Sequence, residues 1–372
     1  MRKQVGVIVA ACFYYSGLVK LARSWMQRSG QRLIILNYHR ATGGDLRRHL
    51  LYLRRHYRML HLEEALEELY MPPQEVKRVR DRRTPLVLTF DDGYRDNYTH
   101  AFALAYELQV PITIFLIPGY VESGDYFWWQ EGKRLVRRAQ VGEVTMGGRT
   151  YHLSQPGEQD MLAQTIDVRL RNATSVAERE AFLETVRKVL AVPSSVTEEE
   201  ETTLPLRWTE IRKMEESGWV SFGAHTMHHP VLACLKDSEE VRHEVGACRR
   251  ALEQYLDHPV RTFAYPVGKL EDIGDEGLQA VQEAGYDWVV TTIHGMNTPQ
   301  SDPHQLRRVM GDVSRHWLVM AAEISGLWHF FFAQRLGEKA SEEYLQVFLS
   351  RSGKGLIYTY VGLFTRLLKE NL

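Results

Sequence analysis

Cysteine is scarce in this sequence. The 372 residues contain three cysteines, Cys12, Cys234 and Cys248, and no CxxC pair. An odd number without that spacing indicates neither a cysteine-based zinc site nor an even disulfide framework. A reducing compartment is therefore permitted, although nothing in the cysteine content requires one.

A surplus of one charge sign is also missing. The chain has 46 basic and 47 acidic residues, and its formal net charge is −1 at pH 7. Domains that bind nucleic acid usually carry a basic surplus or a basic stripe. We therefore expect no nucleic acid partner.

No apolar run reaches the length of about 20 residues that a membrane-spanning helix needs. The apolar stretch at residues 5–19 contains Ser16 and Gly17, and the basic residues that follow it resist translocation. We expect residues 1–31 to form an uncleaved helix that lies at a membrane surface or packs on the domain. The protein is then cytoplasmic or peripheral to the cytoplasmic membrane face; the alternative is an exported, membrane-anchored protein.

The C-terminal tail, residues 313–372, is expected to be helical. Charged residues interrupt its first apolar stretch, so that stretch does not span a membrane. Between Leu356 and Leu368 the apolar residues recur on one helical face. This face packs against the rest of the protein or binds a membrane surface or a partner.

The centre of the chain alternates short apolar runs with helical patterns. A βα series of this kind predicts an α/β fold, with a largely parallel sheet or barrel and helices outside it. The expected strands cover residues 32–38, 85–90, 110–117, 219–224, 262–265 and 286–292, and the expected helices cover 45–56, 95–108, 209–217, 238–256 and 276–284. An insertion at about 120–204, with a helical pattern at 161–189 and an acidic run at 198–201, is expected to be a solvated lid or flank.

Two polar motifs follow predicted strands. Thr89-Phe90-Asp91-Asp92-Gly93-Tyr94 ends one strand, and His225-Thr226-Met227-His228-His229-Pro230 ends another. Histidines four apart can bind one ion, and a carboxylate beside them leaves coordination positions open for water. Each motif alone has a simpler explanation, as a turn or cap in the first case and as ordinary surface or core histidines in the second. In a barrel, both strand ends would face one mouth.

The chain resembles the polysaccharide deacetylases of the NodB-homology group, carbohydrate esterase family 4, over about residues 33–310. The two motifs above match the first and second motifs of that family. Residues 263–268, Phe-Ala-Tyr-Pro-Val-Gly, resemble the third motif, and residues 284–288, Ala-Gly-Tyr-Asp-Trp, resemble the segment after it. The resemblance implies a distorted (β/α) barrel of the NodB type over residues 32–312, with a helical insertion and a helical C-terminal tail.

The resemblance also implies the reaction. Asp92, His225 and His229 become ligands of a divalent metal, with Zn²⁺ favoured, and Asp91 becomes the general base. The protein would then remove the N-acetyl group of an amino sugar in a polysaccharide or lipid-linked saccharide and release acetate. O-deacetylation or hydrolysis of another amide at the same site, and non-catalytic glycan binding, stay open as alternatives. The spacing leaves His228 as a competing ligand.

Two departures from the family concern the groups around the base. The usual late Leu-x-His histidine is not evident, and His39, after the first strand, is our candidate general acid; its alternative is a hydrogen-bonded strand end. Ala264 stands where many members have an arginine that orients the base. Arg307 or Arg308 could pair with Asp91 instead, or both could be solvated.

Candidate substrate contacts complete the predicted site. Flat, amphipathic rings stack on sugars and pack a methyl group, although a tryptophan inside a strand is more often core. Backbone N–H groups of the third motif resemble the oxyanion donors of the family. In the insertion, the pair Trp128-Trp129 is expected to be exposed. The candidates are Tyr94, Tyr265, Pro266, Val267, Trp288 and Arg308.

Overall fold

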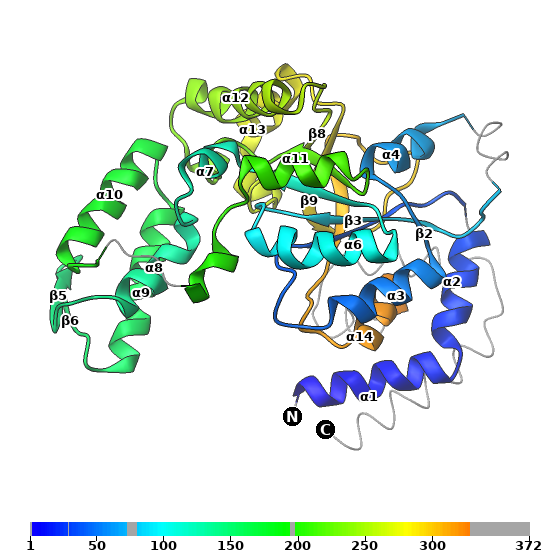
Figure 1. Cartoon of the computed structure of the whole chain (residues 1–372), viewed down its shortest axis with the longest axis horizontal. Helices are drawn as coiled ribbons and strands as arrows, with labels where there is room; N and C mark the ends of the chain where they lie inside the picture. The colour runs from blue at the N-terminus through cyan, green and yellow to red at the C-terminus, as the bar shows by residue number, and fades with distance from the viewer. Residues whose placement is uncertain (1, 29, 73–79, 194–197, 328–372) are drawn as a thin grey trace. The chain divides into compact units, whose positions relative to one another are not determined.

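The computed structural model describes residues 2–28, 30–72, 80–193 and 198–327. The chain divides into two compact units. The larger unit is Met26–Trp317; the smaller contains Met1–Trp25 and the chain from Leu318 onward. Figure 1 shows the larger unit as a barrel of strands with helices around it.

Seven parallel strands close the barrel in the order β1, β10, β9, β8, β7, β4, β3, with β3 pairing back on β1. A two-residue strand, β2 (Arg58–Met59), pairs in parallel with the start of β3. The (β/α) barrel predicted from the sequence is confirmed. The closing strands are β1 (Ile34–Tyr38), β3 (Pro85–Phe90), β4 (Ile112–Leu116), β7 (Val220–Ala224), β8 (Thr262–Ala264), β9 (Trp288–His294) and β10 (Leu306–Met310).

The register of the strands places the two polar motifs at one end of the barrel. Tyr38 is the partner of Phe90, so β1 and β3 end level, and Leu116 is the partner of Ala224, so β4 and β7 end level. Because parallel strands share a direction, the residues that follow them meet at the carboxyl end, where barrel active sites lie. The strands read as continuous apolar runs because both of their faces are covered.

Helices cover the outside of the barrel, and their ends follow local signals. Asp45 caps α3, since its side chain accepts a hydrogen bond from the Arg48 N–H, and Asp237 caps α12 in the same way at Glu239. The π-helical segment η1 continues directly into α6. The helices are α3 (Leu46–His56), α4 (Leu62–Tyr70), η1 (Asn97–Phe102), α6 (Ala103–Leu108), α11 (Trp208–Glu216), η3 (Leu232–Cys234), α12 (Ser238–Leu256) and α13 (Leu270–Glu283).

Several elements differ from the prediction, among them β2 and α4, which were not expected, and two of the differences have a clear cause. Strand β10 was not expected, because two arginines occupy the middle of its five residues and hide the apolar pattern. Helix α13 begins at Leu270 rather than at residue 276, since it contains a kink at Gly274, whose φ of 69° breaks the helical pattern.

The insertion between β4 and β7 has a hydrophobic core of its own. The expected helical pattern at 161–189 is two helices, α9 and α10, separated by a short turn. In Figure 1 the insertion forms the green group of helices at the left. Its elements are α7 (Pro118–Ser123), α8 (Trp128–Arg137), the hairpin of β5 (Glu143–Met146) and β6 (Arg149–His152), α9 (Pro156–Arg171), α10 (Val176–Val189) and η2 (Glu198–Thr203).

The start of the chain is helical. Helices α1 (Arg2–Tyr15) and α2 (Leu18–Arg28) follow one another with a bend of 65°. Among the described residues, no single helix has the length and apolar character to cross a membrane, whereas this bent pair passes that test when both helices are counted together. Helix α14 (Trp317–Ile324) follows the barrel. The amphipathic segment predicted at Leu356–Leu368 lies outside the described residues.

Candidate active site

The first polar motif turns sharply after β3. The Asp91 N–H donates to the carbonyl of Tyr38, 3.0 Å away, and so extends the pairing with β1 by one residue. Asp92 and Gly93 then both have positive φ, 74° and 70°. A Cβ at Gly93 would lie 2.9 Å from Leu116 Cδ2, so this turn requires glycine for space as well as for its backbone angle. The turn directs both carboxylates toward the barrel mouth.

The second motif forms a compact loop after β7. The His225 N–H donates to the Leu116 carbonyl at 2.9 Å, and the His229 N–H donates to Thr226 Oγ1 at 2.9 Å. Thr226 and His229 have positive φ, 64° and 54°. Buried Glu244, from α12, accepts the His228 N–H at 2.8 Å. These bonds hold the loop so that His225 and His229 face the same side.

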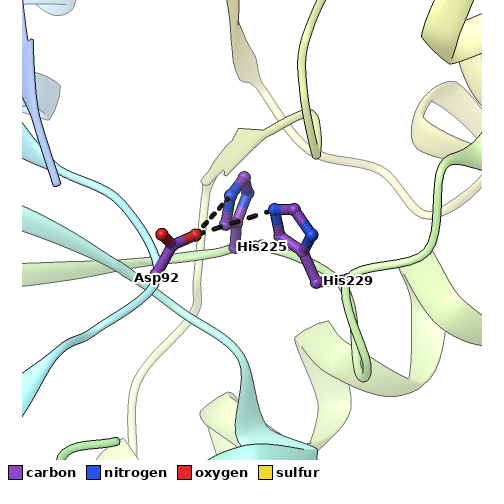
Figure 2. A group of neighbouring side chains, drawn as sticks. All are labelled: Asp92, His225 and His229. Carbon is purple, nitrogen blue, oxygen red and sulfur yellow. Dashed lines mark ion pairs between the residues drawn. The ribbon is translucent and has the colours of Figure 1, made fainter. Parts of the chain in front are cut away.

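Asp92, His225 and His229 form a buried group with ligand atoms within 4.8 Å of one another. Asp92 Oδ1 lies 3.5 Å from His225 Nε2 and 3.6 Å from His229 Nε2. Figure 2 shows the carboxylate and the two imidazole rings pointing toward one another. The structure therefore brings together the three residues that the sequence suggested as metal ligands.

The chemistry of this group fits a divalent cation. His225 Nδ1–H donates to the Ala264 carbonyl at 2.6 Å, which leaves Nε2 with a free lone pair toward Asp92. Burial, reinforced by His225, lowers the pKa of His229 to about 3, so its imidazole is neutral. Burial opposes ionisation of Asp92, but hydrogen bonding to His225 and the charges of the nearby histidines lower its pKa overall. Two imidazoles and one carboxylate are a common donor set for a catalytic zinc ion.

His228 does not join this group. Its Nδ1 lies 2.7 Å from Glu244 Oε1, and the side chain is 38% exposed. With Nδ1 committed to Glu244, the ring is directed toward α12 and packs beside Gly119. The structure therefore favours the outer histidines of the motif over His228.

Asp91 is held from two sides. Arg308 donates from both terminal nitrogens, 2.8 Å to Oδ1 and 2.8 Å to Oδ2, while its Nε donates to the Thr291 carbonyl at 2.7 Å. Asn37 Nδ2 donates to Oδ2 at 3.1 Å. Burial would raise the pKa of Asp91, but the Arg308 charge, the nearby histidines and the hydrogen bonds from Arg308 together outweigh it, and the pKa lies well below its usual range. Asp91 is therefore ionised and fixed in orientation.

The structure thus distinguishes between the two candidate arginines. Arg308 is fully buried and contacts Asp91, whereas Arg307 points to the exposed side of β10. The sequence-based prediction did not include Asn37 among the site residues. The signal was present, because Asn37 is a polar residue in the otherwise apolar run of β1, one residue before the strand ends.

His39 lies at the mouth beside Asp91. Its Nε2 is 3.9 Å from Asp91 Oδ2, beyond hydrogen-bond length, and its side chain is 41% exposed. The imidazole is therefore close to the base and open to solvent, a position in which a substrate could reach it.

The third motif supplies a strained turn. Val267 has a φ of 60°, which is unusual for a β-branched residue. Its carbonyl accepts a 2.8 Å hydrogen bond from Thr292 Oγ1, while its N–H has no partner among the described residues. At Gly268 a Cβ would lie 2.8 Å from the Thr292 nitrogen, so glycine is needed there. An unpaired donor held in a strained turn is available for an oxyanion.

Backbone strain is concentrated at this end of the barrel. Seven non-glycine residues of the described chain have positive φ; Gln109, Ala191 and Asp257 lie at the ends of helices. The other four lie in the three motifs. Strained residues often persist at functional sites because their surroundings fix them there. They are Asp92, Thr226, His229 and Val267.

The structure buries two of the candidate substrate contacts, Trp288 and Tyr265. Trp288 is the first residue of β9, so it lies at the amino end of the barrel, opposite the mouth, and it packs in the core. Tyr265 is 1% exposed, and its hydroxyl group points to the carbonyl of His304 in the segment that leads into β10. Both rings were candidates because their neighbours in sequence resemble family motifs, although for Trp288 the position inside a strand already favoured the core. Pro266 is buried beside Val267 and accepts the Gly268 N–H through its carbonyl.

The aromatic residues of the insertion reach the site instead. Trp129 is half-buried, its ring centroid lies 4.3 Å from that of His229, and its Nε1 donates to the Tyr94 hydroxyl at 2.7 Å. Trp128 is 4% exposed, and its Nε1 donates to the His229 carbonyl at 2.8 Å. The expectation that both tryptophans are exposed is therefore wrong for Trp128. Tyr94 is buried against Phe127 and lies behind Trp129 rather than open to a ligand.

Comparisons with known proteins agree with this architecture. The family model described as polysaccharide deacetylase matches residues 78–191 and 188–289, together more than half of the chain. The structure of the Streptococcus pyogenes deacetylase PplD in complex with acetate is similar, with a TM-score of 0.50, 17% identity, and coverage of 78% of this chain and 97% of that one. At this identity the likeness supports the fold alone.

Two further structures have TM-scores of 0.49. IcaB from Ammonifex degensii is 20% identical, with 79% of this chain and 97% of that one covered. A de-N-acetylase from Aggregatibacter actinomycetemcomitans is 12% identical, with 78% and 98% covered. No curated protein sequence matches the chain.

Proposed function

Because the chain belongs to the polysaccharide deacetylase family, we propose that it is a metal-dependent enzyme that hydrolyses the N-acetyl group of an amino sugar and releases acetate. One observation carries the proposal. Asp91, an ionised carboxylate, lies next to the ligand group of Asp92, His225 and His229 and is oriented by Arg308 and Asn37. A site that only binds glycans does not need an oriented base beside a set of metal ligands.

Asp92, His225 and His229 would hold the metal. A zinc ion bound there would supply an acidified water and polarise the acetyl carbonyl. Asp91 takes the proton of the attacking water. Its Oδ2 already accepts two hydrogen bonds, from Arg308 and Asn37, whereas Oδ1 accepts one from Arg308. Oδ1 therefore has the lone pair that is free for the proton.

The remaining roles fall to the other side of the mouth. The Val267 N–H is the proposed donor to the developing oxyanion, because it has no partner among the described residues and sits in a rigid turn. His39 is the proposed general acid, since it is 3.9 Å from Asp91 and accessible to a substrate. As the C–N bond breaks, the imidazolium proton moves to the leaving nitrogen, and the amine departs with acetate as the other product.

We propose that the sugar ring lies against Trp129. This tryptophan is half-buried and adjoins the His229 ring, so it forms a flat apolar wall beside the ligand group. The proposed substrates are a polysaccharide or a lipid-linked saccharide. Peripheral membrane contact through the first helices suits a lipid-linked substrate. Val5, Ile8 and Tyr15 of α1 support it, because they are exposed at spacings of three and seven residues.

The proposal is tested with the full-length protein and a panel of N-acetylated glycans. Acetate release is measured with and without chelator, and O-acetylated glycans are included as the rival substrates. We expect chelator-sensitive release from at least one N-acetylated glycan. Faster release from O-acetyl groups would instead indicate an esterase, and binding without release of either kind would indicate a glycan-binding protein.

A variant separates the base from the metal. Asp91→Asn should keep the metal and lose turnover by about 10² to 10⁴-fold, the usual contribution of a general base. Metal content is measured by mass spectrometry, and melting curves establish that the variant is folded. Unchanged turnover in this variant would exclude Asp91 as the base.

A further inference from the structure

Asp96 is a buried carboxylate that neither the metal group nor the base uses. It is fully buried, and its Oδ2 accepts four hydrogen bonds from the segment after β1. The four donors are Arg40 Nε at 2.8 Å, Ala41 N–H at 3.1 Å, Thr42 N–H at 3.2 Å and Thr42 Oγ1 at 2.8 Å. One carboxylate oxygen therefore holds three consecutive residues.

The other oxygen of Asp96 connects to His39 through Asn97. Asn97 Nδ2 donates to Asp96 Oδ1 at 3.0 Å and to the His39 carbonyl at 3.1 Å. Two acceptors around the same nitrogen establish the orientation of this amide. Asp96 and Asn97 together thus hold the backbone from His39 to Thr42.

Asp96 suits this role because it is charged. Hydrogen bonds to an ionised acceptor are about twice as strong as neutral ones. The Arg40 guanidinium compensates the buried charge and lies over the Tyr94 ring, 4.7 Å from its centroid. The segment of residues 40–42 therefore contacts Tyr94 and Asp96, which follow β3 as Asp91 does.

The His39 ring, in contrast, has little of its own to hold it. Its side chain is 41% exposed, and its charged neighbour Asp91 is 3.9 Å away. The place of the imidazole therefore depends on the backbone beneath it. A displacement of about 1 Å in a reacting group can cost about 10²-fold in rate.

We propose that Asp96 is the positioning residue of the general acid: through Asn97 and the 39–42 segment it holds His39 where the leaving nitrogen receives its proton. The inference rests on the proposed function, in which His39 is that acid. Asp96 touches neither the substrate nor the metal ligands.

Leaving-group chemistry gives a readout that a general loss of structure would not produce. An amine leaves poorly and needs a proton, whereas a nitrophenolate leaves without one. A defect in the acid therefore slows hydrolysis of an acetamide and spares hydrolysis of 4-nitrophenyl acetate at the same site. A loosened fold or a lost metal slows both reactions.

The experiment compares kcat on two substrates, the N-acetylated glycan that releases the most acetate in the panel and 4-nitrophenyl acetate. Asp96→Asn replaces the acceptor with an amide of the same shape that cannot satisfy four donors. We expect it to lower kcat on the glycan by about 10²-fold and kcat on the ester by less than about 3-fold. His39→Ala should show the same selectivity, and the double variant should be no worse than His39→Ala alone.

Two further variants serve as control and as reserve. Asp272→Asn removes a carboxylate that also pairs with an arginine, Arg171 at 2.7 Å, but lies in α13 away from His39. It should change both rates equally or not at all. Asn97→Ala is measured beside Asp96→Asn, and stands in its place if Asp96→Asn does not fold, since this change removes the bond to the His39 carbonyl and leaves the Asp96 charge in place.

Equal loss on both substrates in Asp96→Asn and Asn97→Ala, or no loss on either, would overturn the positioning role. If His39→Ala slows both substrates equally, or neither, His39 is not the general acid. The wild-type rates and the Asp91→Asn variant still test the proposed deacetylase activity in that case. Selective loss in all three variants with a non-additive double variant supports the inference.

Discussion

Arg308 donates two parallel hydrogen bonds of 2.8 Å to Asp91, although the two residues are 217 positions apart in the chain. Arg308 comes from β10 and Asp91 from the end of β3, and both strands pair with β1. The resemblance to the family implies an orienting arginine in the third motif, where this chain has Ala264. The guanidinium therefore arrives from a different strand and reaches the same kind of acceptor.

Replacing Arg308 should impair both stability and catalysis. Arg308→Met leaves the buried Asp91 charge uncompensated, and we expect a loss of about 3 to 5 kcal/mol in the free energy of unfolding. Arg308→Lys keeps the charge but loses the paired geometry, so it should fold and lose about 10²-fold in kcat. Denaturant unfolding and acetate release measure the two effects. Arg307→Met, at the exposed neighbour, is the matched control. If it lowers stability and kcat as much as the Arg308 variants do, Arg308 is not the residue that orients Asp91.

Metal affinity should depend on the outer histidines of the second motif and not on the inner one. His225→Ala and His229→Ala each remove a ligand atom that lies within 3.6 Å of Asp92 Oδ1. We expect each variant to lose zinc in calorimetric titration, together with chelator-sensitive turnover. His228→Ala loses only its side-chain bond to Glu244 and should still bind zinc. If His228→Ala lowers zinc affinity as much as His225→Ala and His229→Ala do, then the conformation of the loop after β7, and not the set of ligands, controls binding.

The insertion should affect sugar binding more than chemistry. Trp129→Ala removes the ring beside His229, so we expect a rise in KM of about 10-fold for an oligosaccharide, consistent with about 1.4 kcal/mol of lost contact. KM for 4-nitrophenyl acetate, which has no sugar, should change little. Steady-state kinetics on both substrates measure the effect. A matching loss on the simple ester would show that Trp129 supports the metal site rather than the glycan.

Buried His49 should make the fold sensitive to acid. Its Nδ1 faces the Tyr38 hydroxyl at 2.8 Å, and its Nε2 faces the Arg315 carbonyl at 2.9 Å. Both bonds suit a neutral ring that accepts at Nδ1 and donates at Nε2. Burial lowers the pKa of His49, and it outweighs the opposing effects of the Arg315 carbonyl, Asp45 and Asp312, while His316 acts in the same direction as burial.

The sign of the pH dependence follows from this shift. Below about pH 6.5 the unfolded chain binds a proton at His49 that the folded protein does not, so the free energy of unfolding falls as the pH falls. His49→Phe should flatten this slope between pH 7 and 5, even if it lowers stability throughout. The exposed His100→Asn is the control and should leave the slope as in the wild type. The free energy of unfolding is measured by denaturant unfolding at four pH values, and its slope against pH is compared among the three proteins.

The sequence predicted the barrel because its strands are buried on both faces and therefore stand out as apolar runs. It predicted the metal group for a related reason, since Asp92, His225 and His229 follow two such runs directly. Both kinds of signal are local, and the register of β3 and β7 converts them into proximity.

The features that the sequence did not predict are of two kinds. Some depend on contacts between residues far apart in the chain, and others on a local pattern that charged residues obscure. Arg307 and Arg308 alternate across β10, so one is buried and one exposed, but a five-residue strand with two arginines shows little periodicity. Asn37 and Asp96 looked like ordinary polar residues, because their partners are more than fifty positions away. Tyr265 and Trp288 were candidate sugar contacts although both are buried, since resemblance to a motif does not say whether a ring points to the mouth or into the core.

Closure of the barrel by β10 has a consequence for how the protein is made. At usual rates of translation, about 10 to 40 s separate the synthesis of Asp91 from that of Arg308. During that interval the nascent chain holds a carboxylate at its future mouth with no guanidinium to neutralise it, and β1 and β9 lack the strand that lies between them. The active site can therefore be completed only after the last barrel strand has left the ribosome.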